Sequence, residues 1–135
     1  MSSKKTDTLN LTTVHEWPEP ALDEDDVYPT EAAIEFIEKY PTTGSLLDLF
    51  AFIESIWWQS EMLWHELEMF DVDTKRHVKQ YHISTGGWSG NEDIICALQM
   101  TKYNYIWICT WVQSRRGGQY IFEVDLEQAD RNFQF

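Results

Sequence analysis

The sequence has few cysteines and no long apolar run, and each shortage argues against a class of protein. Its two cysteines, Cys96 and Cys109, are too few for a disulfide framework. Both lie in apolar periodic runs, so we expect them to be buried and reduced, as in a cytoplasmic protein. No uninterrupted apolar stretch has the length of a membrane span. The polar residues 1–11 lack the apolar region of a signal peptide, so we expect a cytoplasmic protein without a membrane partner.

Basic residues are also scarce, because 10 Lys and Arg stand against 23 Asp and Glu, which gives a formal charge of −13. Residues 1–76 carry 17 acidic and 5 basic side chains, whereas residues 77–135 carry 6 and 5. Contacts to phosphates need clustered cations, so this composition argues against direct binding of nucleic acid. A partner with a basic surface is the natural complement of such a chain. The alternative is that the carboxylates only keep the protein soluble.

Apolar and aromatic residues, in contrast, are plentiful. Hydrophobic residues make up 43% of the chain and include seven Trp and seven Phe, which excludes disorder over the whole length. A chain of 135 residues is long enough for one domain with a core. Three prolines and four consecutive acids are typical of a tail over residues 1–29. We therefore predict an acidic tail over 1–29 and a single domain over 30–135.

Two helices are predicted in the front half of this domain. Thr30 is a suitable N-cap for a helix over 31–40, which Pro41 ends. Apolar residues then recur every three or four positions, and this spacing predicts one long amphipathic helix over 45–70. Its opposite side presents the candidate partner-binding residues Glu54, Trp58, Glu61, His65 and Glu68. Trp58 is either covered by a neighbouring element or an exposed anchor for a partner.

The back half reads as strands around one helix. We predict a strand over 78–83, a helix from Gly90 to about Thr101, and a strand over 103–113 that is rich in β-forming residues. A hairpin turn over 114–118 leads into a strand over 119–126, whose alternation places Tyr120, Phe122 and Val124 inward. The fold class is therefore α+β, in the order α-α-β-α-β-β, with a sheet of about three strands packed by the long helix. The strands on either side of the third helix pair either in parallel or antiparallel.

Half of the six glycines lie in a turn between the predicted strand and the third helix. Backbone N–H groups at a helix start can hold a phosphate or carboxylate. The candidate ligand residues in this turn are Gly86, Gly87, Trp88, Ser89, Gly90 and Asn91. Arg115 and Arg116 would join them if both glycine turns lie at the same end of the sheet. The early acids Glu92 and Asp93 oppose an anion. The structural alternative is a tight turn in which Trp88 plugs the core, with Ser89 and Glu92 as a capping box.

Catalytic and metal motifs are incomplete. Ser89 resembles a hydrolase nucleophile on a strand-turn-helix, but the required second glycine is one residue too early, at Gly90. The pair His65-Glu66 is followed by Met69 where a zinc protease motif has its second histidine. We therefore predict no catalytic residue, no metal ligand and no cofactor.

The segment Ser84–Glu92, together with Ser114–Gly118 and the aromatic stretch between them, resembles short uncharacterised proteins of bacteriophages and prophages. The resemblance covers about residues 81–124 and implies no activity that can be assigned to particular residues. It implies a viral accessory context, in which small acidic proteins often inhibit host defence or nucleic-acid machinery.

Two functions follow from these observations. The first is a non-enzymatic acidic binding protein, a phage-type inhibitor in the host cytoplasm whose acidic helical face docks on a basic host protein. The alternative is a small-ligand-binding or enzymatic domain that uses the Gly86–Gly90 turn with Arg115 and Arg116. A broad carboxylate face without a pocket favours the first, and a concave site joining both glycine turns favours the second. The oligomeric state stays open.

Overall fold

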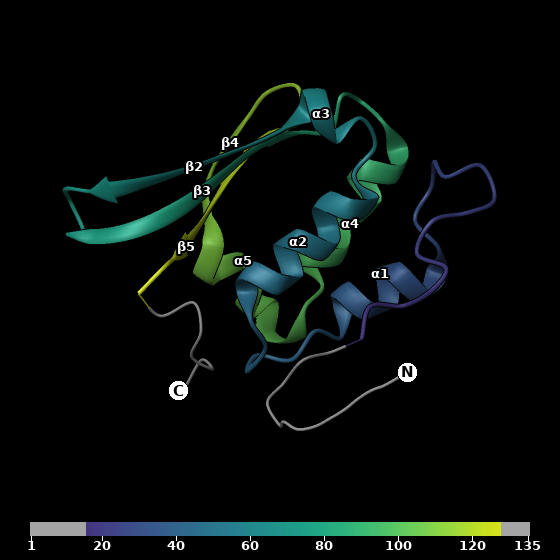
Figure 1. Ribbon diagram of the computed structural model, residues 1–135, viewed down its shortest axis with the longest axis horizontal. Coiled ribbons are helices and arrows are strands. Elements are labelled where there is room, and N and C mark those ends of the chain that lie inside the picture. Colours follow the sequence, from purple (N-terminus) through teal and green to yellow (C-terminus); the bar gives the residue numbers. More distant parts are fainter. Residues whose placement is uncertain (1–15, 128–135) are drawn as a thin grey trace.

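A computed structural model describes residues 16–127 as a four-stranded antiparallel sheet with helices packed on one of its faces (Figure 1). The elements in chain order are α1 (Glu31–Glu38), α2 (Leu46–Ile56), α3 (Ser60–Leu63), β2 (Trp64–Asp71), β3 (Arg76–Ser84), α4 (Ser89–Gln99), the 3-10 turn η2 (Lys102–Asn104), α5 (Tyr105–Thr110), β4 (Trp111–Arg115) and β5 (Gln119–Asp125). The predicted α+β class is confirmed, with four strands in place of about three. None of the helices in this part of the chain has both the length and the apolar character that crossing a membrane requires.

The first two helices begin at the predicted caps. The Thr30 hydroxyl accepts a hydrogen bond from the Ala33 N–H at 3.1 Å, and the Ser45 hydroxyl accepts one from the Asp48 N–H at 3.1 Å. Each bond satisfies a backbone donor that the first helical turn leaves without a partner. These local sequence signals therefore determine where α1 and α2 start.

The predicted helix over 45–70 is wrong beyond its first three turns. Helix α2 ends at Ile56, and Gln59 has a left-handed φ of 55° before the single turn of α3. Residues 64–71 then form strand β2, which pairs with β3 over its whole length. Apolar residues at 64, 67 and 70 match a helical spacing, but they lie on alternate faces of the strand. Pairing with β3 outweighs the helical periodicity.

The predicted strand over 103–113 is also wrong for most of its length. Tyr103 and Asn104 have positive φ angles of 59° and 55°, and they lead into helix α5 instead. Within α5 the Thr110 hydroxyl donates to the Ile106 carbonyl at 2.7 Å, one helical turn earlier, and both residues are buried. Only residues 111–115 are extended, as β4.

The sheet order is β2-β3-β5-β4, and every neighbouring pair is antiparallel. Strands β3 and β5 pair directly, whereas β4 lies at the edge, so no parallel crossover joins the strands around α4. The core lies between the sheet and the helices, where Phe50 of α2 stacks on Tyr81 of β3 at 4.5 Å between ring centroids. The predicted inward residues of β5 are confirmed, because Phe122 and Val124 are buried and Tyr120 packs against the same core.

The predicted tail lies partly outside the described residues, which begin at residue 16. Residues 16–29 pack on the domain, with the Trp17 ring 5.4 Å from that of Phe52 and Tyr28 stacked on Trp88. This segment holds its acidic side chains at defined positions on the surface.

Both cysteines are free and exposed, so the prediction that they are buried is wrong. Cys96 lies on the outward side of α4, between the buried residues Ile95 and Ala97. Cys109 lies on α5. It is exposed because residues 105–110 form a helix and not the sheet strand in which it was predicted to be buried.

Candidate functional site

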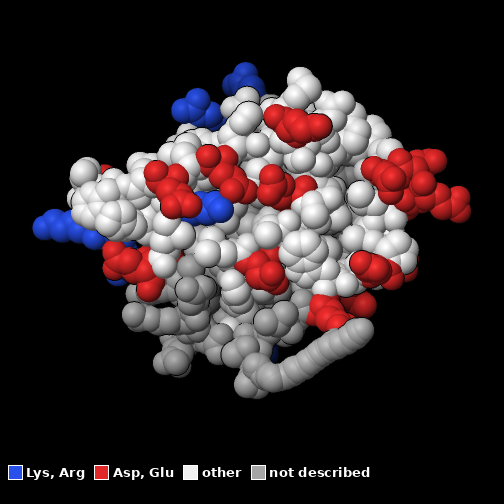
Figure 2. Space-filling model, in the orientation of Figure 1, with Lys and Arg blue, Asp and Glu red and all other residues white. Residues whose placement is uncertain are grey.

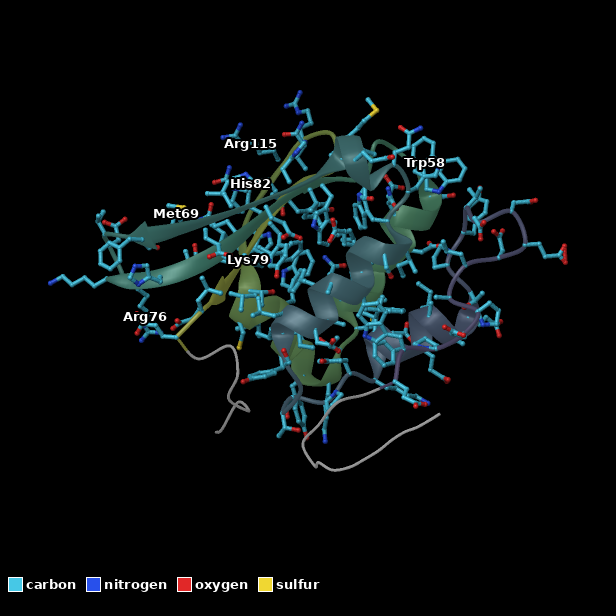
Figure 3. All side chains as sticks on the ribbon, viewed as in Figure 1. Trp58, Met69, Arg76, Lys79, His82 and Arg115 are labelled. Carbon is cyan, nitrogen blue, oxygen red and sulfur yellow. The ribbon has the colours of Figure 1, made fainter. Side chains whose placement is uncertain are left out.

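The helices leave one face of the sheet uncovered, and this face carries a row of polar side chains at one end, whereas Val78 on the same face is only 2% exposed. Tyr81 and Ile83 are buried toward the helices, so His82 and Ser84, which alternate with them along β3, point to the open face. Figure 3 shows His82, Arg115 and Met69 on this side of the sheet, and Lys79 on the helical side. We call this surface the open face.

The strand register places two rows of side chains across the open face. One row runs through all four strands and consists of His65, His82, Ile121 and Gln113. The row beside it consists of Ser84, Gln119 and Arg115. Neighbouring strands are about 5 Å apart, and rows on one face are about 7 Å apart. A small molecule is therefore large enough to contact both rows at once.

These two rows form the floor of a cavity with a volume of about 350 Å³. The lining residues are Leu63, His65, His82, Ile83, Ser84, Gln113, Arg115, Gln119, Tyr120 and Ile121. The volume lies in the range of small-molecule sites, which combine apolar walls with a few polar groups. Although the chain has a formal charge of −13, no carboxylate is among these described lining residues.

Arg115 is the cation of this cavity, and within residues 16–127 it forms no ion pair. The other strand cations are engaged, since Arg76 contacts Asp125 at 2.7 Å and Lys79 contacts Glu66 at 3.0 Å. A guanidinium carries five N–H donors in a fixed plane, which matches a carboxylate or phosphate. The arrangement therefore leaves Arg115 available to an anion from outside the described chain.

The two histidines lie directly opposite each other on β2 and β3. His65 Nε2 is 3.1 Å from the Met62 carbonyl oxygen, and His82 Nε2 is 2.9 Å from Gln80 Oε1. Both contacts are with acceptor oxygens, so they suit the tautomer in which Nε2 donates and Nδ1 is left as an acceptor. The Gln80 amide N–H in turn donates to Glu123 Oε1 at 2.8 Å, so this carboxylate of β5 is hydrogen-bonded.

The two glycine turns meet at one end of the sheet. The Thr85 N–H donates to the Gly118 carbonyl at 3.0 Å, and a Cβ at Gly118 would overlap the Thr85 hydroxyl. Ser84 and Arg115 flank Gln119 on its two sides, so the cavity adjoins both turns. Arg115 lines this cavity, and none of the predicted ligand residues 86–91 does. Arg116, the next residue in the hairpin, is exposed and does not line the cavity.

The start of α4 is occupied by the protein itself. The Trp88 ring stacks on Tyr28 at 4.9 Å and on Trp58 at 4.6 Å, so Trp58 is covered by a neighbouring element. The Asn91 side chain bonds the backbone of Trp58 and Thr85. Gly86, Gly87, Ser89 and Gly90 shape this turn, with positive φ at the first two. The cavity described above lies beside the turn, on the open face.

The predicted capping box is wrong, because α4 begins at Ser89 itself. Trp88 is the N-cap residue, and it makes no side-chain capping bond. The Glu92 carboxylate instead accepts a long hydrogen bond of 3.5 Å from the Thr85 hydroxyl. Ser89 therefore has no capping role.

The five residues predicted as one acidic stripe are dispersed. Glu54 is on α2, Trp58 follows it in a loop, and Glu61 is on α3. His65 and Glu68 are on β2 at positions of opposite parity, so they lie on opposite faces of the sheet. They share no helical face because the long helix does not exist.

Glu54 instead lies beside the helical side of β2, next to Glu66 and Lys79. Partial burial, and then the nearby Glu66 carboxylate, raise the pKa of Glu54 above its ordinary value of 4.5. Burial acts in the same direction on Glu66, but the Trp64 indole N–H and the Lys79 ammonium outweigh it and lower its pKa. Ionisation of Glu54 is therefore opposed in the folded protein.

Replacing Glu54 with Gln should raise the melting temperature at pH 7. A carboxyl group with a raised folded-state pKa contributes stability that is present below its unfolded pKa and lost as the pH rises through the folded value. The amide resembles the neutral acid, so the gain should disappear near pH 3.5. Thermal unfolding at both pH values measures this difference, with Glu61→Gln as an exposed control. A gain of equal size at both pH values would contradict the assigned cause.

Sequence reasoning identified Arg115 but missed His82, Ser84, Gln113 and Gln119. For His82, Ser84 and Gln119 the signal is the alternation of polar with apolar residues along β3 and β5, which places them on one face only once the register is known. Gln113 is on the short strand β4 and joins them through its pairing with Ile121. No group of three or more metal-ligating side chains lies together within residues 16–127. Comparison of the chain with known proteins found no matching family model, no matching curated protein and no matching solved structure.

Proposed function

We propose that this protein is a binding protein that holds a small organic anion, a carboxylate or a phosphate ester, in the cavity of its open face. The observation that carries the proposal is an arginine without an ion pair among the described residues, Arg115, in a cavity whose described lining has no carboxylate. In a chain with a formal charge of −13, such a place is electrostatically distinct from the rest of the surface.

The lining supplies the contacts that an organic anion needs. Arg115 provides a two-pronged donor, and Gln113, Gln119 and Ser84 add neutral donors around it. Leu63 and Ile121 provide apolar surface for the carbon skeleton of the ligand. Binding fits this lining better than catalysis, because no hydrogen bond joins Ser84 to either histidine among the described residues.

Replacing Arg115 with Ala should weaken binding of phenyl phosphate or benzoate by about tenfold or more, because a charge-assisted hydrogen bond contributes about 1.5–3 kcal/mol. Arg116→Ala is the matched control, since it removes the same charge from the same hairpin but not from the cavity. Isothermal titration calorimetry of the wild type and both variants measures the effect. Equal losses in the two variants would show a general charge effect and contradict the site.

The acidic surface supports a second candidate function. Residues 16–38 contain nine acidic side chains and no Lys or Arg. Figure 2 shows a group of carboxylates at the right, where Figure 1 places the loop that precedes α1. We propose, as this second function, that the protein is a phage-type inhibitor that docks on a basic host protein. Docking would use residues 16–38 in place of the predicted long helix.

The triple variant Glu24→Gln, Asp25→Asn, Asp26→Asn tests this second candidate. Single exposed ion pairs contribute only about 0–1 kcal/mol, so the charges act through their summed field. A specific host partner should be captured by the wild type at low salt and lost both in the triple variant and at high salt. A partner retained by the triple variant would contradict docking through this segment.

A further inference from the structure

One long segment of this acidic chain has no acidic residue. Residues 94–122 contain no Asp or Glu, whereas Lys102, Arg115 and Arg116 give this segment three cations. It runs from the middle of α4 through η2, α5 and β4 into β5. We call residues 94–122 the acid-free segment.

The acid-free segment contains an exposed sheet edge. In the order β2-β3-β5-β4, strand β4 is terminal, and within residues 16–127 no strand pairs with its second side. An edge strand of this kind presents unpaired N–H and C=O groups that another strand can bond. β4 is only five residues long, but its own Val112 is 43% exposed, and Ile108 of the preceding helix α5 is 68% exposed.

Apolar side chains are also exposed elsewhere in the acid-free segment. Tyr103, held outward by its positive φ of 59°, is 83% exposed, and Met100 is 68% exposed. A backbone in this left-handed region is strained for a residue with a side chain, and such strain is concentrated at functional positions. The acid-free segment thus combines the unpaired backbone groups of its edge strand with several exposed apolar side chains.

We infer that a second copy of this chain binds at this edge, with β4 paired antiparallel to β4 of the other copy across a two-fold axis. A two-fold interface requires a surface that complements itself, and an antiparallel strand edge does so. Two chains of charge −13 repel each other, and the acid-free segment is where they meet with the fewest facing carboxylates. The nearest acid on the adjoining strand, Glu123 of β5, is already hydrogen-bonded to Gln80.

This inference does not depend on the anion site. Pairing at an edge extends the sheet sideways to eight strands and leaves the open face of each copy uncovered. The proposed ligand cavity and the dimer can therefore be tested separately.

Sedimentation velocity over a range of protein concentrations tests the dimer, with Val112→Lys and Val72→Lys as matched variants. Both valines are exposed, but Val72 lies at the tip of the β2–β3 hairpin. Val112→Lys places two like charges at the interface and should weaken dimerisation by about tenfold or more, whereas Val72→Lys should leave it unchanged. Circular dichroism establishes that both variants are folded.

Salt gives a second readout. Because the two copies repel each other by their net charge, added NaCl should strengthen the dimer, whereas attraction between opposite charges would weaken with salt. A monomer at all concentrations up to about 1 mM would overturn the inference. Equal dimerisation of the wild type and Val112→Lys would overturn the assignment to β4, as would a dimer that weakens in salt.

Discussion

Replacing Trp57 with Ala should lower the free energy of unfolding by about 3–5 kcal/mol. Trp57 is 4% exposed and packs edge-on against Trp64, with 5.6 Å between ring centroids. Its indole N–H also donates to the Ser84 carbonyl at 3.0 Å, so the variant leaves both a cavity and an unsatisfied acceptor. Urea unfolding followed by circular dichroism measures the loss.

Trp111→Ala is the control for this prediction, because Trp111 is an exposed tryptophan of the edge strand β4. Its ring stacks on Trp107 and its N–H donates to Ser114 at 2.7 Å, so we expect a loss of about 1–2 kcal/mol, below that of Trp57→Ala. Trp57→Phe should fall between the two, since it retains an aromatic ring but not the N–H donor. Losses of equal size at Trp57 and Trp111 would contradict the placement of Trp57 in the core.

Replacing Asn91 with Ala should cost about 3 kcal/mol, because three hydrogen bonds of roughly 1 kcal/mol each are lost. Asn91 Oδ1 accepts from the Trp58 N–H at 2.9 Å, and Nδ2 lies 3.3 Å from both the Trp58 and the Thr85 carbonyl oxygens. The residue is buried, so water replaces none of these partners. This side chain fastens the loop after α2 to the glycine turn before α4.

Asn91→Asp should be at least as destabilising at pH 7, although it preserves the shape of the side chain. It replaces a donor with a carboxylate oxygen that faces two carbonyl oxygens. Gln99→Ala, an exposed change on the same helix, is expected to be nearly neutral. The measurement is again urea unfolding, and an Asp variant as stable as the wild type would refute the hydrogen-bond assignment.

The parts of the fold that depend on local chemistry were predictable from the sequence. The caps Thr30 and Ser45, the hairpin over 114–118 and the inward side of β5 all follow from residues within a few positions of each other. Such signals act between neighbours along the chain, so they need no knowledge of the tertiary structure.

The two incorrect elements depend on contacts that are distant in sequence. Residues 64–71 have apolar residues at helical spacing, and only the partner strand β3 makes them extended. Residues 105–110 consist of strong β-formers, and only the burial of Ile106 and Thr110 under the sheet makes them helical. The spacing of apolar residues along the chain does not show which distant segment each of these two stretches contacts.

The candidate site was half predictable for the same reason. Arg115 was predictable as a hairpin residue next to a glycine turn, but the meeting of the two glycine turns depends on the pairing of β3 with β5. The histidine row was not predictable, because the predicted helix over 45–70 placed His65 on the side of the helix that faces away from the sheet. Only the pairing of β2 with β3 brings His65 opposite His82.

The most direct test of the anion site is an amide NMR titration of the full chain with phenyl phosphate. The proposal predicts the largest shifts at residues 82–84, 113–115 and 119–121, which surround the cavity, and their loss in Arg115→Ala but not in Arg116→Ala. Shifts confined to the α4 N-terminus at residues 88–92, or no shifts at millimolar ligand, would contradict the account.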